Sequence, residues 1–341
     1  LSDRLGRKKV AVGFQVLSAL MYIPCGFPAL GELVPWFVIL SVFFDGATDP
    51  ARTAMMTDLS TPDNRQSAFS LGYLGHNLGF AVGPLIAGFL FEAAPSWIFW
   101  GNALAALAAV SLVALKVPET KPSQEAIEAS KGSGSSEEAH EGSLLSALAS
   151  RPFLIVYTLI GTLYGFVYAQ HRFALPLLTE ALFKATGATI YGSLMTLNAV
   201  LVILLTTLVV KLTRGRKPIW SVAAAGFLYA LGFGIIGLCR TPILLYLSTS
   251  IWTLGEIVHA TNDGTYVANH TPMSHRGRFQ AVLPIVGGLG WAASSPIVGK
   301  IIAASGLDPV WGLLALAAGG AGLGFVVLGI AESRRPKSGA V

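Results

Sequence analysis

Ten stretches of this 341-residue chain are apolar over about 20 residues, the length a helix needs to cross a bilayer. Only helices and closed barrels satisfy the backbone hydrogen bonds there. The chain is 53% hydrophobic and 12% charged, whereas soluble domains are about 25% charged. The sequence therefore predicts an all-α membrane protein with spans near 10–30, 33–56, 66–91, 96–116, 152–175, 187–211, 218–239, 242–268, 277–304 and 308–331.

One polar segment separates the first four apolar stretches from the last six. Residues 117–151 include a Gly- and Ser-rich sequence at 131–138, which is too polar to bury and too poor in apolar residues to fold alone. We therefore expect an N-terminal helical half at 1–116, a linker at 117–151 and a C-terminal half of six helices at 152–341.

Features of the two halves recur at a nearly constant spacing. The basic loop around Gly6 returns around Gly215, 209 residues later. Arg65 returns as Arg276 after 211 residues. Several features repeated at one spacing indicate an internal duplication. Because only the second half has two apolar stretches before its basic loop, we expect an N-terminally truncated protein that lacks the first two of twelve helices.

The basic residues predict the orientation of the chain. Most of the 23 lysines and arginines fall in loops that strict alternation places on one side, whereas Lys184 and Arg240 fall on the other. Cytoplasmic loops carry such an excess of basic residues. We therefore expect a multi-pass protein of the cell membrane, with the linker and the C-terminal tail in the cytoplasm. The net charge of +5 then sets orientation and does not indicate nucleic-acid binding.

Two segments resemble motifs of one transporter family. The opening Asp3-Arg4-Leu5-Gly6-Arg7-Lys8-Lys9 is similar to the loop between the second and third helices of the major facilitator superfamily, without its leading glycine. Gly79-Phe80-Ala81-Val82-Gly83-Pro84-Leu85-Ile86-Ala87-Gly88 resembles the fifth-helix motif of the drug/proton antiporter branch. The resemblance covers the whole chain and implies two halves of six helices. The fourth-helix arginine of many antiporters is Val42 here, a departure that bears on the usual proton-coupling scheme.

The resemblance also implies roles for individual residues. The loop motif ties helices together on the cytoplasmic side and stabilises the outward-facing state, so it implies a cytoplasmic gate of Asp3, Arg4, Gly6, Arg7 and Asp58. The first and fourth helices of each half line the central cavity in this family, which implies a cavity wall at 33–56, 152–175 and 242–268. The substrate-cavity residues expected on these spans are Tyr164, Tyr168, Gln170, Trp252 and Asn262. Tyrosines near a span end are also typical of the membrane interface.

Glycines recur every four residues in the span 66–91, at Gly75, Gly79 and Gly83. A helix face without side chains allows a neighbouring helix to approach closely. Pro84 follows and favours a bend, because it removes a backbone hydrogen bond. The face is interpreted equally well as tight packing or as a seam that flexes during transport. With Gly88, these positions make up the fifth-helix motif.

Each half carries three ionisable residues on one helical face inside a span. They are Asp45, Asp49 and Arg52 in the first half and Glu256, His259 and Asp263 in the second. A charged group inside a membrane is costly and by default marks a functional site. Asp49 pairs most simply with Arg52 at i,i+3. We expect the proton-coupling residues among Glu256, Asp45, His259 and Asp49, with Glu256 and Asp45 favoured because neither has an adjacent cation in the sequence.

Together these features predict a secondary active transporter that moves a small organic solute by alternating access. The segment 79–88 favours proton-coupled efflux of drug-like compounds, and proton-coupled uptake of a sugar, peptide or other polar metabolite is the alternative. The expected partners are the solute, protons and the lipid bilayer, without nucleic acid, and we expect a monomer. We expect no metal or cofactor, because Cys25 and Cys239 give no metal-ligand spacing. The chain also lacks the sequence motifs of hydrolases and nucleotide-binding enzymes, which argues against an enzyme.

Overall fold

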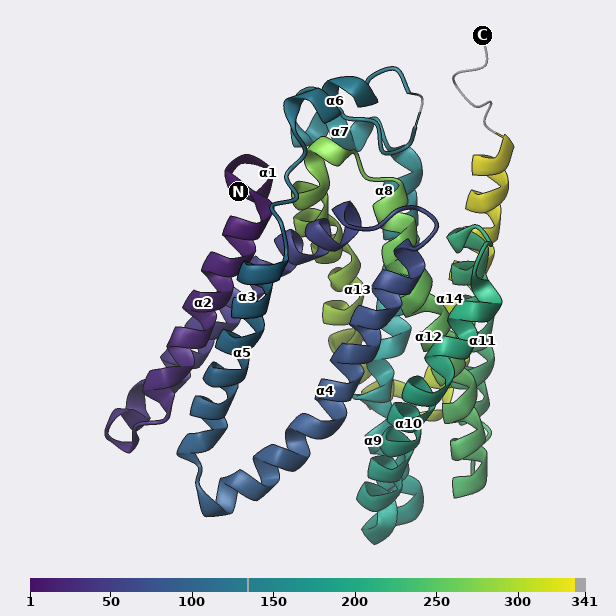
Figure 1. The fold of residues 1–341 in the computed structure, drawn as a ribbon. Helices are drawn as coiled ribbons and strands as arrows, with labels where there is room; N and C mark the ends of the chain where they lie inside the picture. Colours follow the sequence, from purple (N-terminus) through teal and green to yellow (C-terminus); the bar gives the residue numbers. More distant parts are fainter. Residues whose placement is uncertain (134, 335–341) are drawn as a thin grey trace. The chain divides into compact units, whose positions relative to one another are not determined.

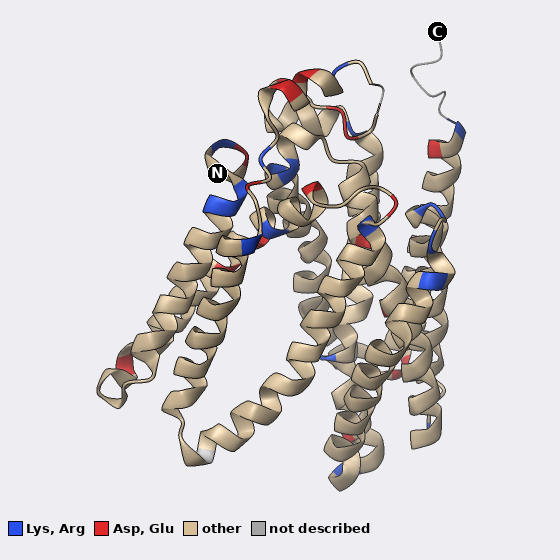
Figure 2. Cartoon of the chain, in the orientation of Figure 1, with Lys and Arg blue, Asp and Glu red and all other residues tan. Residues whose placement is uncertain are grey.

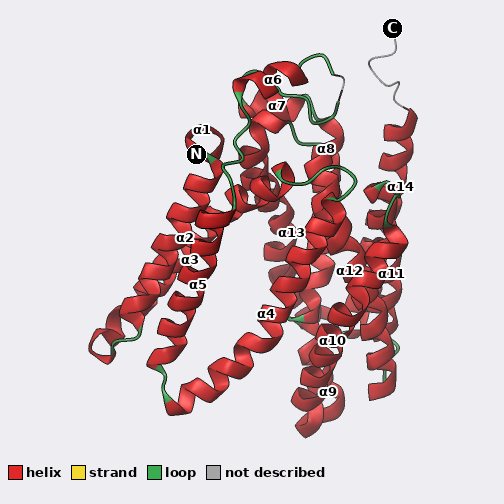
Figure 3. Ribbon diagram, viewed as in Figure 1, coloured by secondary structure: helices red, strands yellow, loops and turns green. Residues whose placement is uncertain are grey.

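The computed structural model describes residues 1–133 and 135–334. Gly134 of the predicted linker and the predicted cytoplasmic tail from residue 335 onward lie outside the described residues. The described part consists of helices joined by short loops, without a strand (Figure 3). The α-helices are α1 (Ser2–Leu5), α2 (Arg7–Cys25), α3 (Val34–Asp58), α4 (Arg65–Ala93), α5 (Ser96–Lys116), α6 (Gln124–Ser130), α7 (Leu144–Ala149), α8 (Pro152–Tyr168), α9 (Ala174–Phe183), α10 (Gly187–Thr213), α11 (Pro218–Ile236), α12 (Pro242–Asn269), α13 (Arg276–Ser305) and α14 (Asp308–Arg334). The 3-10 helices are η1 (Pro28–Leu33), η2 (Ala169–His171), η3 (Lys184–Thr186) and η4 (Met273–His275).

Eight helical stretches of the described residues are long and apolar enough to cross a membrane. The sequence predicted ten, and the difference has two causes. One of the eight, Pro152–Thr213, contains α8, α9 and α10 together. The helix α2 is not among the eight, because it begins with three basic residues and carries Gln15 in its middle. The chain is a multi-span membrane protein.

The predicted span 152–175 is not one continuous helix. The helix α8 ends at Tyr168, and the turn η2 leads into α9. Side chains of the turn hold backbone carbonyls at this end, since His171 Nδ1 lies 2.5 Å from the Tyr168 carbonyl and Gln170 donates to the Phe166 carbonyl at 3.3 Å. Such bonds satisfy carbonyls that a helix end leaves unpaired. The chain then continues into α9 (Ala174–Phe183), most of which was predicted to be a loop between two spans.

The helices group into two compact units, which are described separately. Unit 1 comprises Leu1–Thr61, Leu78–Ala147 and Thr271–Val282. Within it α2 packs against both α3 and α5, and the three run side by side (Figure 1). Their shared core is formed by four buried residues of α2 and α3, namely Val10, Ala11, Ala51 and Met55.

Unit 2 comprises Pro62–Asn77, Leu148–His270 and Leu283–Val341. Here α11 packs against α12 and α14, α10 packs against α12, and α8 packs against α14. The α11 and α14 backbones meet at Gly226, where an added Cβ would lie 2.8 Å from the Gly322 Cα. Any side chain at this point would force the two helices apart. Across both units, charged side chains are sparse along the middle of the long helices and more frequent near helix ends (Figure 2).

The glycine face predicted on α4 is not packed against another helix. No neighbouring atom lies within 4 Å of the position a Cβ would take at Gly75, Gly79, Gly83 or Gly88. The tight packing that was one of the two interpretations of these glycines is therefore not seen among the described residues, and Pro84 lies inside α4. Close approach through glycine is found instead in unit 2.

Candidate functional site

Glu256 lies on α12 and is 8% exposed. The Tyr73 hydroxyl donates to its Oε1 at 2.8 Å, and Asn198 Nδ2 donates to its Oε2 at 2.7 Å. Asn198 Nδ2 also donates to Thr253 Oγ1 at 3.0 Å, which fixes the amide in place. Among the described residues, no lysine or arginine forms an ion pair with Glu256. Neutral donors from α4 and α10 therefore hold both oxygens of a buried carboxyl group.

This arrangement suits a group that gains and loses a proton. Neutral donors stabilise a carboxylate without fixing it permanently in the charged form, as a close cation would. A carboxyl group inside a membrane protein is costly and is generally placed where its ionisation is used. Because Tyr73 belongs to α4 and Asn198 to α10, a change in the charge of Glu256 alters how two other helices are held on α12.

Two further ionisable residues follow Glu256 along α12. His259 Nε2 lies 3.8 Å from Asp263 Oδ1, and the Tyr157 hydroxyl donates to the same oxygen at 2.8 Å. Tyr157 is 2% exposed and comes from α8. The structure thus places Glu256, His259 and Asp263 along one face of α12, as the sequence spacing predicted, with Glu256 buried and the Asp263 side chain 43% exposed.

The corresponding stripe on α3 has a different environment. Asp45 is exposed and accepts one hydrogen bond, from Gln15 Nε2 at 3.3 Å. Asp49 forms an ion pair with Arg52 at i,i+3, as predicted, and both side chains are more than half exposed. The two stripes match in sequence position, but only the one on α12 includes a buried residue, Glu256.

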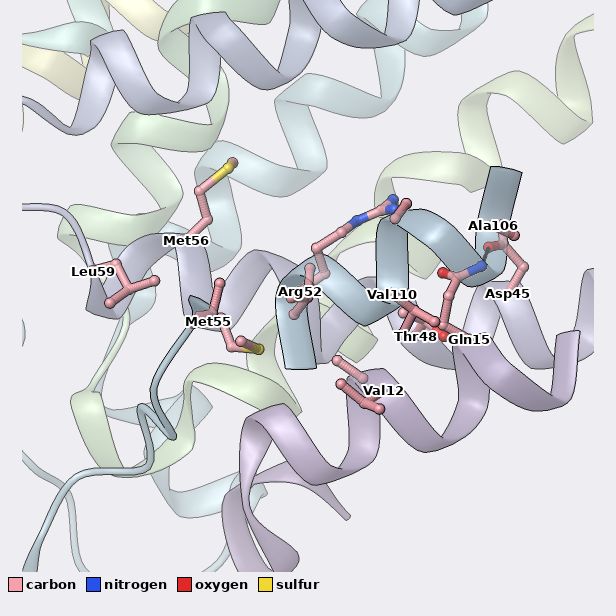
Figure 4. Close-up of a pocket in the computed structure, with 14 residues that line it drawn as sticks. Val12, Gln15, Asp45, Thr48, Arg52, Met55, Met56, Leu59, Ala106 and Val110 are labelled. Carbon is pink, nitrogen blue, oxygen red and sulfur yellow. Dashed lines mark hydrogen bonds between the residues drawn. The ribbon is translucent and has the colours of Figure 1, made fainter. Parts of the chain in front are cut away.

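Asp45 borders a cavity of about 470 Å³ within unit 1. Its wall comes from α2, α3 and α5 and is mostly apolar, with Val, Met, Leu and Ala side chains. Figure 4 shows Asp45 beside Gln15 at one end of this cavity and Met55 and Met56 towards the other. The cavity therefore combines a large apolar wall with two charged residues: Asp45, which contacts no cation among the described residues, and Arg52, which is paired with Asp49.

The residues predicted to line the substrate cavity lie in the packed interior of unit 2. Four of them are at most 1% exposed, namely Tyr164, Gln170, Trp252 and Asn262. Tyr168 is half-buried and lies 6.0 Å from Trp252 between ring centroids. The structure thus brings Tyr168 and Trp252 together, and none of the five borders the cavity of unit 1. Their role in binding a solute remains a prediction.

Five charged residues of unit 1 form a second group, which we call the charge cluster: Asp3, Arg7, Asp58, Glu137 and Arg276. Asp58 forms ion pairs with both Arg7 and Arg276. Arg276 also pairs with Glu137, and Arg7 lies 3.7 Å from Asp3. The side chains of Arg7 and Asp58 are 1% and 8% exposed. The sequence predicted that Asp3, Arg7 and Asp58 meet, and the structure brings them together.

Asp3 has an additional contact that the sequence did not predict. Its two oxygens accept the backbone N–H groups of Gly277 at 2.9 Å and Arg278 at 3.1 Å, in the first turn of α13. The first N–H groups of a helix have no partner within the helix, and an acidic side chain at this end is favoured by the helix dipole. Asp3 therefore caps a helix that begins more than 270 residues later in the sequence.

Gly6 and Arg4 complete the loop motif in different ways. Gly6 has φ 111° and connects α1 to α2. A side chain there would also meet Glu119, whose carboxylate accepts the N–H of Arg7 at 2.7 Å. Arg4 is exposed, and its carbonyl accepts from Lys121 Nζ at 2.8 Å. The glycine is thus required by geometry, whereas Arg4 contributes its backbone.

Several residues of these sites were not singled out from the sequence. Tyr73, Asn198 and Tyr157 donate to the carboxylates of Glu256 and Asp263 but stand in apolar runs with no local pattern that marks them. Glu137 lies in the linker and was read only as part of a polar segment. Their roles depend on contacts between segments that are distant in sequence, so composition and spacing carry no signal for them. Among the described residues, no group of three His, Cys, Asp or Glu side chains is placed to hold a metal ion.

Comparison with known proteins identifies the family. The profile of the Major Facilitator Superfamily matches residues 1–295. The chain belongs to the Major Facilitator Superfamily. It is therefore a membrane transporter and not an enzyme. Members of the Major Facilitator Superfamily bind small-molecule substrates, often use protons and lie in a lipid bilayer.

Three similar proteins illustrate the comparison. The uncharacterized MFS-type transporter YhjO of Bacillus subtilis is 26% identical over 323 residues, which cover 89% of this chain and 72% of YhjO. A Na⁺, Li⁺, K⁺/H⁺ antiporter of Planococcus maritimus is 22% identical, with 91% of this chain and 82% of the antiporter covered. The structure of the proton:xylose symporter XylE matches with a TM-score of 0.72 and 17% identity, over 94% of this chain and 80% of XylE. At this identity the last match establishes the fold alone.

Proposed function

We propose that this protein is a proton-coupled secondary transporter that exports drug-like organic solutes by alternating access, with Glu256 as the residue that carries the coupling proton. The observation that carries the proposal is the setting of Glu256: a buried carboxyl group whose two oxygens accept from Tyr73 and Asn198 and which has no ion-pair partner among the described residues. The similarity to an antiporter that exchanges cations for protons supports the same class of mechanism.

Protonation of Glu256 changes the packing of α12. The charged carboxylate accepts strong hydrogen bonds from Tyr73 on α4 and Asn198 on α10. Hydrogen bonds to an ionised group are about twice as strong as those between neutral groups. When Glu256 takes up a proton, both attachments weaken together, and α4 and α10 become easier to move relative to α12. This links the charge of one carboxyl group to the conformation of the transporter.

The export of amphipathic compounds is supported by the cavity of unit 1. Its apolar wall fits a hydrophobic body, and the carboxylate of Asp45 at its edge fits a positive charge. Clefts of 300–1,000 Å³ that are mostly apolar and carry few polar groups are typical of sites for small organic ligands. The resemblance of residues 79–88 to the motif of drug/proton antiporters points in the same direction.

The charge cluster supports a role in closing one face of the transporter. It joins Asp58 at the end of α3, Arg7 at the start of α2 and Arg276 at the start of α13. The positive-inside rule assigns these loops to the cytoplasm. In the proposed mechanism the charge cluster holds the cytoplasmic side closed in the outward-facing state and opens when the protein turns inward. Breaking one charge-assisted bond, worth about 1.5–3 kcal/mol, is enough to change a two-state population about tenfold.

This latch is testable through accessibility. Asp3→Asn removes the charge that caps α13 and approaches Arg7. We expect faster modification of single cysteines introduced at the cytoplasmic ends of α2 and α13 in Asp3→Asn than in the parent protein. Unchanged modification rates would show that these charges only orient the chain.

Transport itself is tested in proteoliposomes that contain the purified full-length protein under an imposed proton gradient. Ethidium and tetraphenylphosphonium serve as cationic probes, and xylose and a dipeptide serve as polar probes. We expect gradient-driven accumulation of the cations, loss of this accumulation in Glu256→Gln, and survival of cation exchange without a gradient. The variant Asp308→Asn, in an exposed ion pair with Arg240, is a matched control that keeps driven transport.

Two results would overturn the proposal. Driven transport near the parental rate in Glu256→Gln would show that the carboxyl group is structural. Transport of xylose or the dipeptide together with protons, without transport of the cations, would establish the alternative function of an uptake symporter for polar metabolites.

A further inference from the structure

Five ionisable residues lie along one face of α12: Glu256, His259, Asp263, Tyr266 and His270. We call them the α12 stripe. They follow one another at intervals of three or four residues, which keeps them on the same side of a helix. They span 14 residues, or about 21 Å at 1.5 Å per residue. A row of this length reaches from the middle of the helix to its C-terminal end.

From His259 onward, contacts link the members of the α12 stripe and extend it. Beyond Asp263, the ring of Tyr157 stacks on that of Tyr266 with centroids 3.9 Å apart. The Tyr266 hydroxyl donates to Glu332 Oε2 at 3.2 Å, and His270 Nε2 lies 3.0 Å from Glu332 Oε1. Glu332 belongs to the last turn of α14. The stripe therefore ends in a carboxylate and an imidazole near the ends of two helices.

Between Glu256 and Asp263 the stripe is enclosed by aromatic rings. Tyr229 from α11 is 1% exposed, and its ring centroid lies 6.3 Å from that of His259. Tyr229 also interacts electrostatically with Glu256 and with Asp263. Tyr164 from α8 meets His259 edge-on at 5.1 Å. One imidazole thus lies between two carboxyl groups along the helix, with aromatic rings beside it.

We propose that the α12 stripe, with Tyr157 and Glu332, is the pathway by which protons travel between Glu256 and the cytoplasmic end of α12. The inference rests on the proposed function, because it assigns a route to the proton that Glu256 carries. It adds His259, Asp263 and Tyr157 as residues that move the proton, a role distinct from binding the transported solute. Chains of Asp, Glu and His inside membrane proteins are suited to this task.

Each step conserves the proton. The Glu256 carboxyl group releases its proton to Nδ1 of His259, one turn further along the same face, and the imidazolium releases the proton on Nε2 to the Asp263 carboxylate. His259 is then in its other tautomer and returns to the first before the next transfer. The Asp263 carboxyl group passes the proton to the Tyr157 hydroxyl, which releases its own proton through a bridging water molecule to the Tyr266 hydroxyl, and Tyr266 releases its proton to Glu332. His270 then takes the proton from Glu332 at the helix end. The route runs equally well in the opposite direction.

Charged and titratable groups on the neighbouring helices border the pathway at both ends. Around Glu256 these are Tyr73 on α4, Tyr168 on α8 and Arg172 after η2, which acts on Glu256 through its charge. Around Glu332 it is Lys217 at the start of α11, which acts electrostatically on that carboxylate. Between the two ends, the tyrosines described above are neutral groups that donate or accept hydrogen bonds. The middle of the pathway therefore holds no competing fixed charge among the described residues.

The competing explanation is that the bond between Tyr157 and Asp263 only ties α8 to α12. The two explanations differ in what they predict for the rate at which Glu256 is protonated. A pathway residue sets how fast Glu256 exchanges its proton but leaves the final degree of protonation unchanged. A structural tie affects stability and has no effect on that rate.

The test is time-resolved infrared spectroscopy of the protein in liposomes after a light-triggered release of protons. The carboxyl band of Glu256 is assigned by its absence in Glu256→Gln. In Asp263→Asn and His259→Gln we expect this band to reach its parental amplitude but to rise about tenfold to a hundredfold more slowly, the range typical of a lost proton-transfer group. Asp308→Asn removes an exposed carboxylate at the other end of α14. In this variant the Glu256 band should rise at the parental rate.

Tyr157→Phe provides a second test that keeps the ring stacked on Tyr266 and removes only the hydroxyl. It is decisive if Asp263→Asn does not fold. The pathway would be overturned if the Glu256 band rose at the parental rate in Asp263→Asn. If Asp263→Asn does not fold, the same result in Tyr157→Phe would overturn it. A loss of amplitude of the Glu256 band would also overturn it. Failure of the proposed function is separate, because it appears as proton-driven transport that persists in Glu256→Gln whatever the kinetics of the band.

Discussion

The Tyr73 hydroxyl donates to Glu256 Oε1 at 2.8 Å across a separation of 183 residues in the sequence. With Asn198 on the other oxygen, it leaves the buried carboxylate satisfied by neutral groups alone. An unpaired charge in such a place costs several kcal/mol, and a paired one is difficult to neutralise reversibly. A carboxyl group that is hydrogen-bonded by neutral donors lies between these two cases. This is the setting required by a residue that alternates between two protonation states.

Removing this donor should destabilise the protein. In Tyr73→Phe one oxygen of Glu256 loses its hydrogen bond, and bonds to charged groups contribute about 1.5–3 kcal/mol. We expect a lower midpoint of thermal unfolding in detergent for Tyr73→Phe. Tyr22→Phe, at a half-buried position of α2, is the matched control and should unfold like the parent. Equal midpoints for the two variants would show that the hydrogen bond between Tyr73 and Glu256 contributes little to stability.

Asp58→Asn should be more damaging than a change at an exposed ion pair. Asp58 is shared by Arg7 and Arg276, whose side chains are 1% and 8% exposed, so the substitution leaves two nearly buried guanidinium groups with less compensation. Breaking a buried pair costs about 3–5 kcal/mol. Asp308→Asn, at an exposed pair, should cost at most about 1 kcal/mol. Chemical denaturation of both variants measures the difference, and similar losses would contradict the prediction.

Gly6→Ala should destabilise the start of α2. The backbone there has φ 111°, a conformation that costs a residue with a side chain about 1–3 kcal/mol. The new methyl group would also lie about 2.5 Å from Glu119 Oε2. Gly13→Ala, inside the same helix with open space around it, should be neutral or stabilising by up to about 1 kcal/mol. Thermal unfolding compares them, and an unaltered Gly6→Ala would refute the geometric requirement.

The contact between the linker and α2 should weaken in acid. Partial burial acts to raise the pKa of the Glu119 carboxyl, but backbone N–H donors from Lys8, Lys121, Arg7 and Thr120 outweigh it and hold the pKa below its ordinary value. A lowered pKa in the folded state means that the contact is fully stabilising above the ordinary pKa of a glutamate. Its contribution is lost as the pH falls through the lowered value.

This pH dependence is measured with spin labels at residues 9 and 122. The distribution of distances between them should be narrow at neutral pH and broaden in acid. In Glu119→Gln the distribution should not change with pH over this range, because the titrating group is gone. A parental distribution that stays narrow below the lowered pKa would contradict the assignment.

Long-range contacts explain which parts of the structure were predictable from the sequence. Helix positions followed from apolar runs, which are local, so most bounds agree within a few residues. The break after Tyr168 was missed because it depends on Gln170 and His171 turning back on backbone carbonyls. The glycines on α4 left two interpretations open, because a small-residue face indicates packing only when another helix lies against it.

The same reasoning applies to the sites. The spacing of Glu256, His259 and Asp263 predicted one shared face, since helical periodicity is a property of the sequence itself. Their partners Tyr73, Asn198 and Tyr157 come from other helices and carry no local signal. Asp45 and Glu256 are related by position in the repeat but differ in burial, because burial is decided by neighbouring helices.

The sharing of Asp58 by Arg7 and Arg276 has a consequence for how the protein can change over evolution. Neutralising any one member of the charge cluster leaves its partners with an odd, nearly buried charge, so a lineage that loses Arg276 is expected to lose Asp58 or Glu137 as well. Asp3 is further constrained, because its oxygens serve the backbone of α13 as well as Arg7. Among descendants of this sequence, positions 58, 137 and 276 should therefore vary in concert, whereas position 3 should remain acidic.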